Sequence, residues 1–289
     1  MLNLTAAVST ALLVLIAIVL LAASTYSQRS AATVPDDASA PVEKISSLRV
    51  MTVDNAQDQE GVQPAVAITN DGRIVEVHRS DEGADLWYSV ATTSDDGLSV
   101  SWTSNSRLNI DGSTIRGMTP DVCTMQIDLD GPPYKEHAVI LVYRSKADST
   151  IHYCYGVLES DNSISWERDA QVVPSFSNYG NVNALDGFRP RAAADTRGYA
   201  HYEGNSEYCS GKIAMACQKE DPENDRYDLL LLPGVINPYE DKVDWQSATI
   251  PSTAGFGSSS DADISVWDNS VIVAGSRDEE LYYYTGKFQ

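Results

Sequence analysis

Short runs of alternating apolar and polar residues follow one another along most of the chain. Between residues 73 and 102, for example, three such runs are separated by polar turns and closed by a tryptophan. A period of two predicts strands with one buried face, and no long segment has the 3.6-residue period of an amphipathic helix. The pattern therefore predicts an all-β domain.

The order of runs recurs, so the sequence predicts a repeat protein. Each of four copies has a second run that ends near a basic residue, then an acidic turn and a third run. Three copies begin with Gly-x-x-Pro, at 61–64, 117–120 and 187–190. Three copies carry a tryptophan in a short fourth run, and these are Trp102, Trp166 and Trp245. Four short strands in roughly 55 to 70 residues are typical of a β-propeller blade.

The repeats predict a β-propeller of four blades, each with four antiparallel strands. The blades span about 61–116, 117–186, 187–256 and 257–289. The last copy ends after three strands, and the alternating run 45–53 has nothing nearby to pair with. We expect 45–53 to close the ring as the fourth strand of the last blade, which removes two exposed sheet edges. The alternative is an isolated strand in the preceding linker.

The N-terminal segment 1–27 predicts a transmembrane anchor or an uncleaved signal. Residues 2–23 carry no charge, and at about 1.5 Å each they reach roughly 33 Å, enough to cross a bilayer core. A cleaved signal is the alternative, because small residues follow at 22–24. Arg29 alone favours a cytoplasmic position for the rest of the chain, and the cysteines favour the opposite. Residues 28–44 are rich in Ala, Ser, Pro and Asp, typical of a flexible stalk.

The charge of the chain restricts its partners. The net charge is −21, from 41 acidic and 20 basic residues, which excludes naked nucleic acid and anionic membrane surfaces as natural partners. Aspartate outnumbers glutamate and arginine outnumbers lysine, a composition that suits a halophilic protein, because salt screens the self-repulsion. An acidic extracellular protein from ordinary seawater is the alternative.

The four cysteines allow two disulfides. Cys209 and Cys217 lie eight residues apart and would pin the loop 198–211. Cys123 and Cys154 fall on the first and third strands of the second blade, so their disulfide needs a distorted sheet. Buried thiols are the alternative for all four. Neither the cysteines nor the four histidines have the spacing of a zinc site, so we expect no metal and no cofactor.

The segment 93–102, TSDDGLSVSW, resembles the Asp-box of the sialidase-type β-propellers. Asp95, Gly97 and Trp102 match that motif in kind, although two extra residues separate the glycine from the tryptophan. The second copy keeps an aspartate and Trp166, and the third copy keeps only Trp245. In that family the aspartate caps a turn and the tryptophan packs between sheets. The resemblance therefore implies a fold and gives these residues structural roles.

The resemblance also implies sialidase chemistry, which this sequence does not reproduce. That family uses three arginines, a tyrosine nucleophile with a glutamate, and an aspartate acid/base. The first copy begins GVQPAVAI, with no arginine where the family has Arg-Ile-Pro, and only Arg189 and Arg191 in the third copy resemble it. Four blades are also fewer than the six of that family. We expect a non-catalytic protein, with a sialidase-like glycoside hydrolase as an alternative.

The repeated basic residues are candidates for ligand binding. They are Arg79, Arg144, Lys219 and Arg277, and the third runs add Tyr88, Tyr153 and Tyr282. Because loops after equivalent strands share one face of a propeller, these residues would form a ring that holds an anionic or hydroxylated ligand such as a glycan. Alternatively each basic residue pairs with the acid that follows it and stiffens the turn.

Together these features predict a membrane-anchored, extracytoplasmic recognition or assembly module at a cell surface or in a viral envelope. The membrane is contacted through residues 2–23, and a glycan, a protein receptor or a larger oligomeric assembly is the expected partner. The alternative from another class is a structural subunit of an envelope or virion of a halophile. A pocket lined by arginine and tyrosine favours recognition, whereas a broad apolar lateral patch favours assembly.

Overall fold

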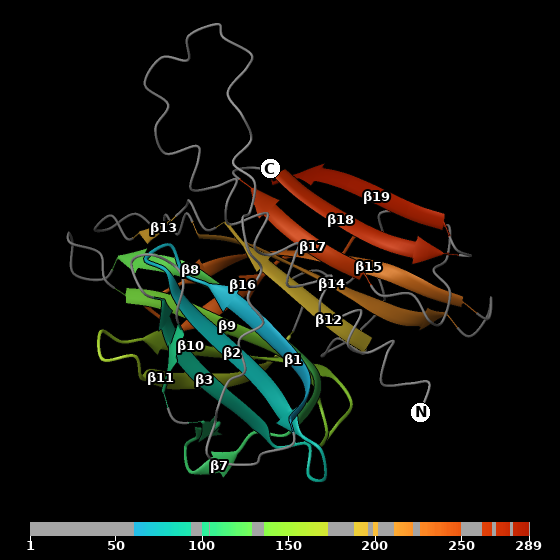
Figure 1. The fold of residues 1–289 in the computed structure, drawn as a ribbon. Helices are drawn as coiled ribbons and strands as arrows, with labels where there is room; N and C mark the ends of the chain where they lie inside the picture. The colour runs from blue at the N-terminus through green and yellow to red at the C-terminus, as the bar shows by residue number, and fades with distance from the viewer. Residues whose placement is uncertain are drawn as a thin grey trace, which may run out of the picture. The chain divides into compact units, whose positions relative to one another are not determined.

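The computed structural model describes most of the chain from Gly61 onward, within the unit Val53–Gln289 (Figure 1). The described ranges are 61–93, 100–103, 105–128, 136–172, 188–195, 199–201, 211–221, 226–249, 262–267, 270–277 and 280–288. These residues form strands and turns, which confirms the all-β class. None of the described ranges supplies a helix that could span a membrane. The expected anchor, the stalk and the run 45–53 lie outside the described residues.

The strands form four main sheets that follow the chain in order. The first contains β1 (Gly61–Ile68), β2 (Arg73–Ser80), β3 (Leu86–Thr93) and β4 (Val100–Trp102), with β5 (Ser106–Arg107) also on β3. The second contains β8 (Gly117–Asp128), β9 (Glu136–Ser145), β10 (Ile151–Leu158) and β11 (Ile164–Gln171). Between them lies the small hairpin β6 (Asn109–Ile110) and β7 (Ser113–Thr114).

The other two sheets complete the series. The third contains β12 (Phe188–Ala194), β14 (Gly211–Asp221), β15 (Arg226–Asn237) and β16 (Lys242–Trp245). The fourth contains β17 (Ala262–Trp267), β18 (Ser270–Arg277) and β19 (Glu280–Lys287). Consecutive strands pair antiparallel within each sheet, as the four repeats predict. The described residues give the fourth sheet three strands, one fewer than the meander of each earlier sheet.

One pairing was not foreseen in the sequence. The short strand β13 (Tyr199–His201) adds to the free edge of β8 in parallel, with Tyr199 opposite Gln126. The chain therefore leaves the third sheet after β12, contributes a strand to the second, and returns to the third at β14. This pairing satisfies backbone groups at the edge of β8 that would otherwise be exposed.

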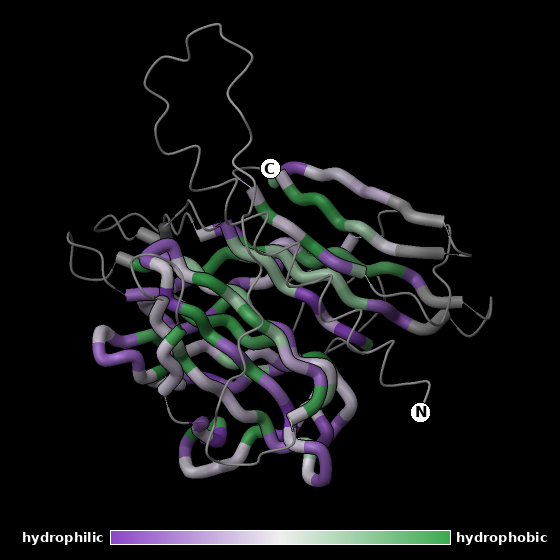
Figure 2. The backbone as a smooth tube through the Cα atoms, in the orientation of Figure 1, coloured by the Kyte–Doolittle hydropathy of each residue, from purple (hydrophilic) through white to green (hydrophobic). Residues whose placement is uncertain are grey.

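Three hydrophobic clusters join the sheets in sequence. One lies between the first and second sheets, one between the second and third, and one between the third and fourth. The sequence of β9 explains its central place: AVILVY at 138–143 is apolar and buried throughout, because a neighbouring sheet covers each of its faces. In β17 the two faces differ, and apolar and polar residues alternate along the strand (Figure 2).

The described residues hold no core cluster between the fourth sheet and the first. The sequence predicted a closed ring, in which those two faces pack together. On these two faces, Val66 of the first sheet and Ile272 of the fourth are 39% and 47% exposed, and closure of the ring stays a prediction. Sheets one to three each have the four-stranded antiparallel meander that was expected.

Candidate functional site

The Gly-x-x-Pro sequences form a repeated β-bulge at one end of the first three sheets. The register of β1, β8 and β12 shifts within this motif. The residue before each proline has a positive φ, 57° at Gln63, 50° at Thr119 and 48° at Arg189. A residue that precedes proline avoids the right-handed helical region, and a bulge accommodates the left-handed alternative. We call this end of the sheets the bulge end.

The glycine of the motif makes room for a ring. A Cβ on Gly117 would lie 2.1 Å from Cδ2 of Tyr143, and a Cβ on Gly61 would lie 2.5 Å from Cδ2 of His78. Both rings come from the second strand of their sheet, one residue before the basic residue. The motif is therefore a packing device that brings the first strand close to an aromatic side chain of the second.

Two of the predicted basic residues occupy equivalent positions at the bulge end. Arg79 donates through Nε to Oε1 of Gln63 at 2.8 Å, and the same oxygen accepts the Thr119 amide of the next sheet at 2.9 Å. Arg144 lies over the Phe188 ring of the following sheet, 4.3 Å from its centroid. Both side chains thus link one sheet to the next bulge.

The other two basic residues are shifted by one position. Val62 pairs with Arg79 and Met118 with Arg144, and the equivalent Phe188 pairs with Gln218 rather than with Lys219. Arg277 is shifted in the same way, because it lies four residues after the buried Val273 of β18, whereas Arg144 lies three residues after the equivalent Leu141 of β9. Because side chains alternate across a strand, a shift of one residue turns a side chain to the other face. The side chain of Arg277 lies outside what the structure describes.

The predicted tyrosines belong to junctions between sheets. Tyr88 meets the Trp166 ring of the next sheet edge to face at 5.5 Å, and Tyr153 meets the Trp245 ring in the same way at 6.0 Å. In each case a third-strand tyrosine contacts the fourth-strand tryptophan of the following sheet. These rings are therefore used for packing, while the side chain of Tyr282 is outside the described set.

The turn before Trp166 shows how the aspartate of this repeat acts. Asp161 Oδ1 accepts the backbone amide of Ser163 at 2.9 Å and its hydroxyl at 2.6 Å. These hydrogen bonds lower the pKa of the exposed Asp161 carboxyl. Asp95 and Gly97 of the first copy lie outside the described residues, and Trp102 ends β4.

The predicted Cys123–Cys154 disulfide is wrong. Both residues are free buried thiols, and they lie on opposite faces of the second sheet, Cys123 toward the third sheet and Cys154 toward the first. Strand β9 also separates their backbones. Cys217 is buried in β14, and Cys209 lies outside the described residues, so that pairing stays a prediction.

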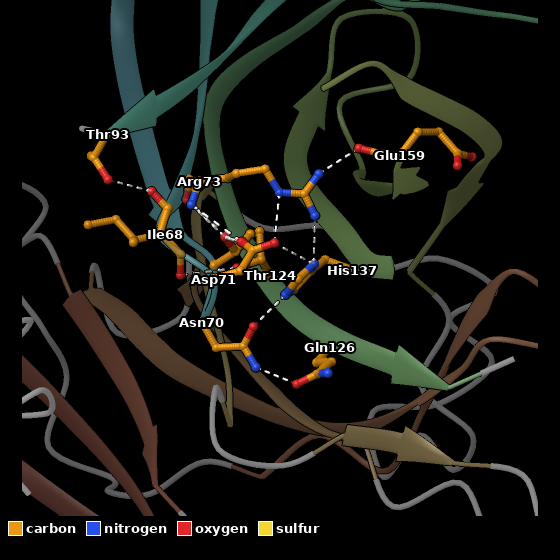
Figure 3. A network of polar contacts seen from close by, with 11 residues as sticks. Ile68, Asn70, Asp71, Arg73, Thr93, Thr124, Gln126, His137 and Glu159 are labelled. Atoms are coloured by element: carbon orange, nitrogen blue, oxygen red, sulfur yellow. Dashed lines mark hydrogen bonds and ion pairs between the residues drawn. The ribbon is translucent and has the colours of Figure 1, made fainter. Parts of the chain in front are cut away.

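A buried polar network ties the first two sheets together at the end opposite the bulges (Figure 3). The Arg73 guanidinium donates to Asp71 Oδ2 at 3.0 Å, to the Glu159 carbonyl at 2.5 Å and to His137 Nδ1 at 3.1 Å. Because an arginine only donates, His137 Nδ1 must accept, and its Nε2 donates to Asn70 Oδ1 at 2.6 Å. These contacts fix which ring nitrogen of His137 accepts and which donates.

Asp71 completes the charge balance of this network. Partial burial acts to raise the pKa of Asp71, but the hydrogen bond from Thr69, the nearby His137 ring and the charge of Arg73 outweigh it and hold the pKa below its usual value. An ionised Asp71 therefore compensates the buried Arg73 cation. The arrangement explains why the β1–β2 turn carries the sequence TNDGR.

A second acid was not singled out in the sequence. Asp121 follows the bulge of β8 and accepts the Ala192 amide of β12 at 2.7 Å. Burial raises the pKa of Asp121 to about 6, against the opposing effect of Arg191, and Asp263 adds to the rise. These charges meet where the first strands of three sheets adjoin. The sequence does show that Asp121 and Arg191 each follow the proline of a Gly-x-x-Pro motif, and this shared position could have indicated that the two charges lie close together.

A histidine bridges two acids on the second sheet. His152 contacts Asp169 Oδ1 at 3.2 Å through Nδ1 and Asp148 Oδ2 at 3.1 Å through Nε2. Partial burial acts to lower the pKa of His152, but these hydrogen bonds raise it above its usual value. The Tyr143 hydroxyl donates to the same Asp169 oxygen at 2.7 Å. Burial raises the pKa of Tyr143 far above its usual value, so the phenol stays protonated.

The outer face of the fourth sheet exposes large apolar side chains. Trp267, Ile272 and Tyr283 are 38%, 47% and 64% exposed and come from β17, β18 and β19. Ile272 lies opposite Ser265 and Thr285, so Trp267 and Tyr283 are its diagonal neighbours on either side. Diagonal neighbours in a sheet are about 7–8 Å apart, within reach of large side chains. We call these three residues the apolar stripe.

Comparisons with known proteins identify no family for this chain. No family model matches the sequence, and no curated protein matches it either. Among solved structures, the NanB sialidase from Streptococcus pneumoniae is similar over 78% of this chain, with 14% identity and a TM-score of 0.39. The matched part covers 29% of that sialidase chain. The likeness is to an all-β fold, and the sialidase's activity is a property of that protein.

Proposed function

We propose that the protein is a membrane-anchored, extracytoplasmic β-propeller-type module that assembles with a protein partner through the outer face of its fourth sheet. The apolar stripe is the observation that carries the proposal. Large exposed apolar side chains that are grouped on adjacent strands mark an interaction surface. The module is non-catalytic and serves as a structural component of an envelope or cell surface.

The placement of the other candidate residues supports assembly over glycan binding. Tyr88 and Tyr153 pack against tryptophans of the next sheet, and Arg144 lies on Phe188. These side chains are engaged in contacts between sheets, which favours assembly over a ligand ring. Ile272 and Tyr283 of the apolar stripe, by contrast, are 47% and 64% exposed.

The proposal includes the N-terminal part of the chain. Residues 2–23 anchor the protein, and 45–53 pair with β19 as the fourth strand of the fourth sheet. The motivation is that the fourth sheet has three described strands and the earlier meanders have four.

A photo-cross-linking experiment tests the function. Benzoylphenylalanine is placed at Ile272 in the full chain within its native membrane, and a control carries it at Glu167, an exposed position of β11. The proposal expects protein adducts from position 272 and none from position 167. Lipid adducts alone at 272, or no adduct, would rule out a protein-binding face.

A further inference from the structure

The occupant of the fourth sheet's outer face can be inferred by asking which surfaces suit it. The face is formed by outward residues of three strands, arranged in three rows across the sheet. The rows are Asp263–Ala274–Tyr283, Ser265–Ile272–Thr285 and Trp267–Ser270–Lys287. The apolar stripe crosses these rows diagonally, with Ile272 at the centre and one aromatic residue at each end.

The first sheet of the same or another chain does not suit this face. In each of the other three sheets the second strand turns a fully buried apolar residue toward the preceding sheet, namely Leu141, Met215 and Val273. The first sheet has Glu76 at this position, held by His78 Nδ1 at 3.0 Å. Pressing Ile272 against Glu76 would remove a carboxylate from water without a new partner, which is costly.

The charge of the face favours a second copy of the same chain. The chain as a whole carries a net charge of −21, so two copies repel each other over most of their surface. Within these three described rows there is one acid, Asp263, and one base, Lys287, in opposite rows. This part of the face is therefore neutral, and two copies can meet there with little repulsion.

The stripe is also complementary to itself. A two-fold axis that lies between two such faces and passes by Ile272 places the two Ile272 side chains against each other. Each aromatic residue then lies over an outward position of the partner's face. Such an isologous contact uses one patch twice and closes the assembly at two chains.

We propose that two copies of this chain form a symmetric dimer by packing the outer faces of their fourth sheets, centred on Ile272. This inference rests on the proposed function, because it names the partner that the protein-binding face takes. It also predicts a closed dimer, whereas packing of the fourth sheet onto another copy's first sheet would build an open chain.

Disulfide trapping of the full chain in detergent tests the dimer. Two variants are compared under mild oxidation, Ile272→Cys on the fourth sheet and Val66→Cys as a matched exposed control on the first. The expected result is a covalent dimer from Ile272→Cys alone, at least tenfold more than from Val66→Cys or from the unmodified chain. Sedimentation of Ile272→Glu should show an equilibrium dissociation constant raised at least tenfold, with Val66→Glu unchanged.

The outcomes separate the dimer from the broader function. A mixture of Ile272→Cys and Val66→Cys that cross-links one to the other would show head-to-tail packing and overturn the symmetric dimer. Monomers at all concentrations, with the circular dichroism of the unmodified chain, would also overturn it. If the photo-cross-link at 272 still captures a different protein, the proposed function stands and only the second copy is wrong. If it captures nothing, both fail.

Discussion

Replacing Gly117 by alanine should destabilise the fold through a single clash. The new Cβ would lie 2.1 Å from the Tyr143 ring and 2.9 Å from two further ring atoms. Tyr143 is only 2% exposed, and its hydroxyl donates to Asp169 at 2.7 Å, so the ring cannot withdraw without breaking that bond. Overpacking costs about 1–3 kcal/mol and a hydrogen bond to a charged group about 1.5–3 kcal/mol. The two costs are not fully additive, because a ring that moves to relieve the clash gives up the hydrogen bond. We therefore expect the free energy of unfolding to fall by about 2–4 kcal/mol.

Urea unfolding of the full chain in detergent, followed by tryptophan fluorescence, measures this loss. Gly286→Ala is the control, because nothing lies within 4 Å of its new Cβ, and we expect it to change the free energy of unfolding by less than about 0.5 kcal/mol. In a Tyr143→Ala background, Gly117→Ala should cost little, since the clashing ring is gone. If Gly117→Ala costs the same in both backgrounds, the clash with Tyr143 is not the cause and the packing argument fails.

Four other predictions address the charges and the junctions. Because the pKa of His152 is raised, its contacts with the two acids stabilise the fold below about pH 6.5 and lose this effect as pH rises through the raised pKa. The difference in free energy of unfolding between the unmodified chain and His152→Gln should therefore shrink as pH rises. A difference that does not change with pH would contradict the bridge. Because the pKa of Asp121 is raised to about 6, the free energy of unfolding should fall as pH rises from about 4 to 6, since the unfolded chain releases this proton first. Asp121→Asn keeps an acceptor for the Ala192 amide, and urea unfolding of this variant at several pH values should show a smaller fall over this range. A double-mutant cycle of Tyr88→Leu and Trp166→Leu should give a coupling of about 0.5–1.5 kcal/mol, whereas Tyr88→Leu and Trp245→Leu should be additive. The melting temperature should rise as KCl is increased from about 0.1 M to about 2 M, because salt screens the net charge of −21; a falling melting temperature would count against the halophilic interpretation.

The sequence predicted the strands well because their alternation is strong, and it located the repeat from the Gly-x-x-Pro and tryptophan positions. It could not predict the register at the end of β14, where Gln218 rather than Lys219 is equivalent to Arg79 and Arg144. An alignment of the basic residues by chain order does not say which face of the strand each side chain occupies. The bulge and the packed core determine that face.

Other features depend on contacts between distant segments. Tyr88 and Tyr153 were candidates for ligand binding because a tyrosine suits either a core or a surface. In the structure each ring packs against a tryptophan of the next sheet. The pKa of Asp121 depends on the meeting of β8, β12 and β17, which no local pattern encodes. The parallel pairing of β13 with β8 likewise has no signal in its three residues.

The series of three core clusters has a consequence for how the molecule opens. Among the described residues, the second and third sheets are packed on both faces, whereas the fourth has a core cluster on one face only. In such a nearest-neighbour arrangement, terminal units open more readily than central ones. Amide hydrogens of β18 should therefore exchange with solvent faster than those of β9 and β14. A second copy seated on the outer face of the fourth sheet would slow that exchange, so local protection of one strand would depend on protein concentration.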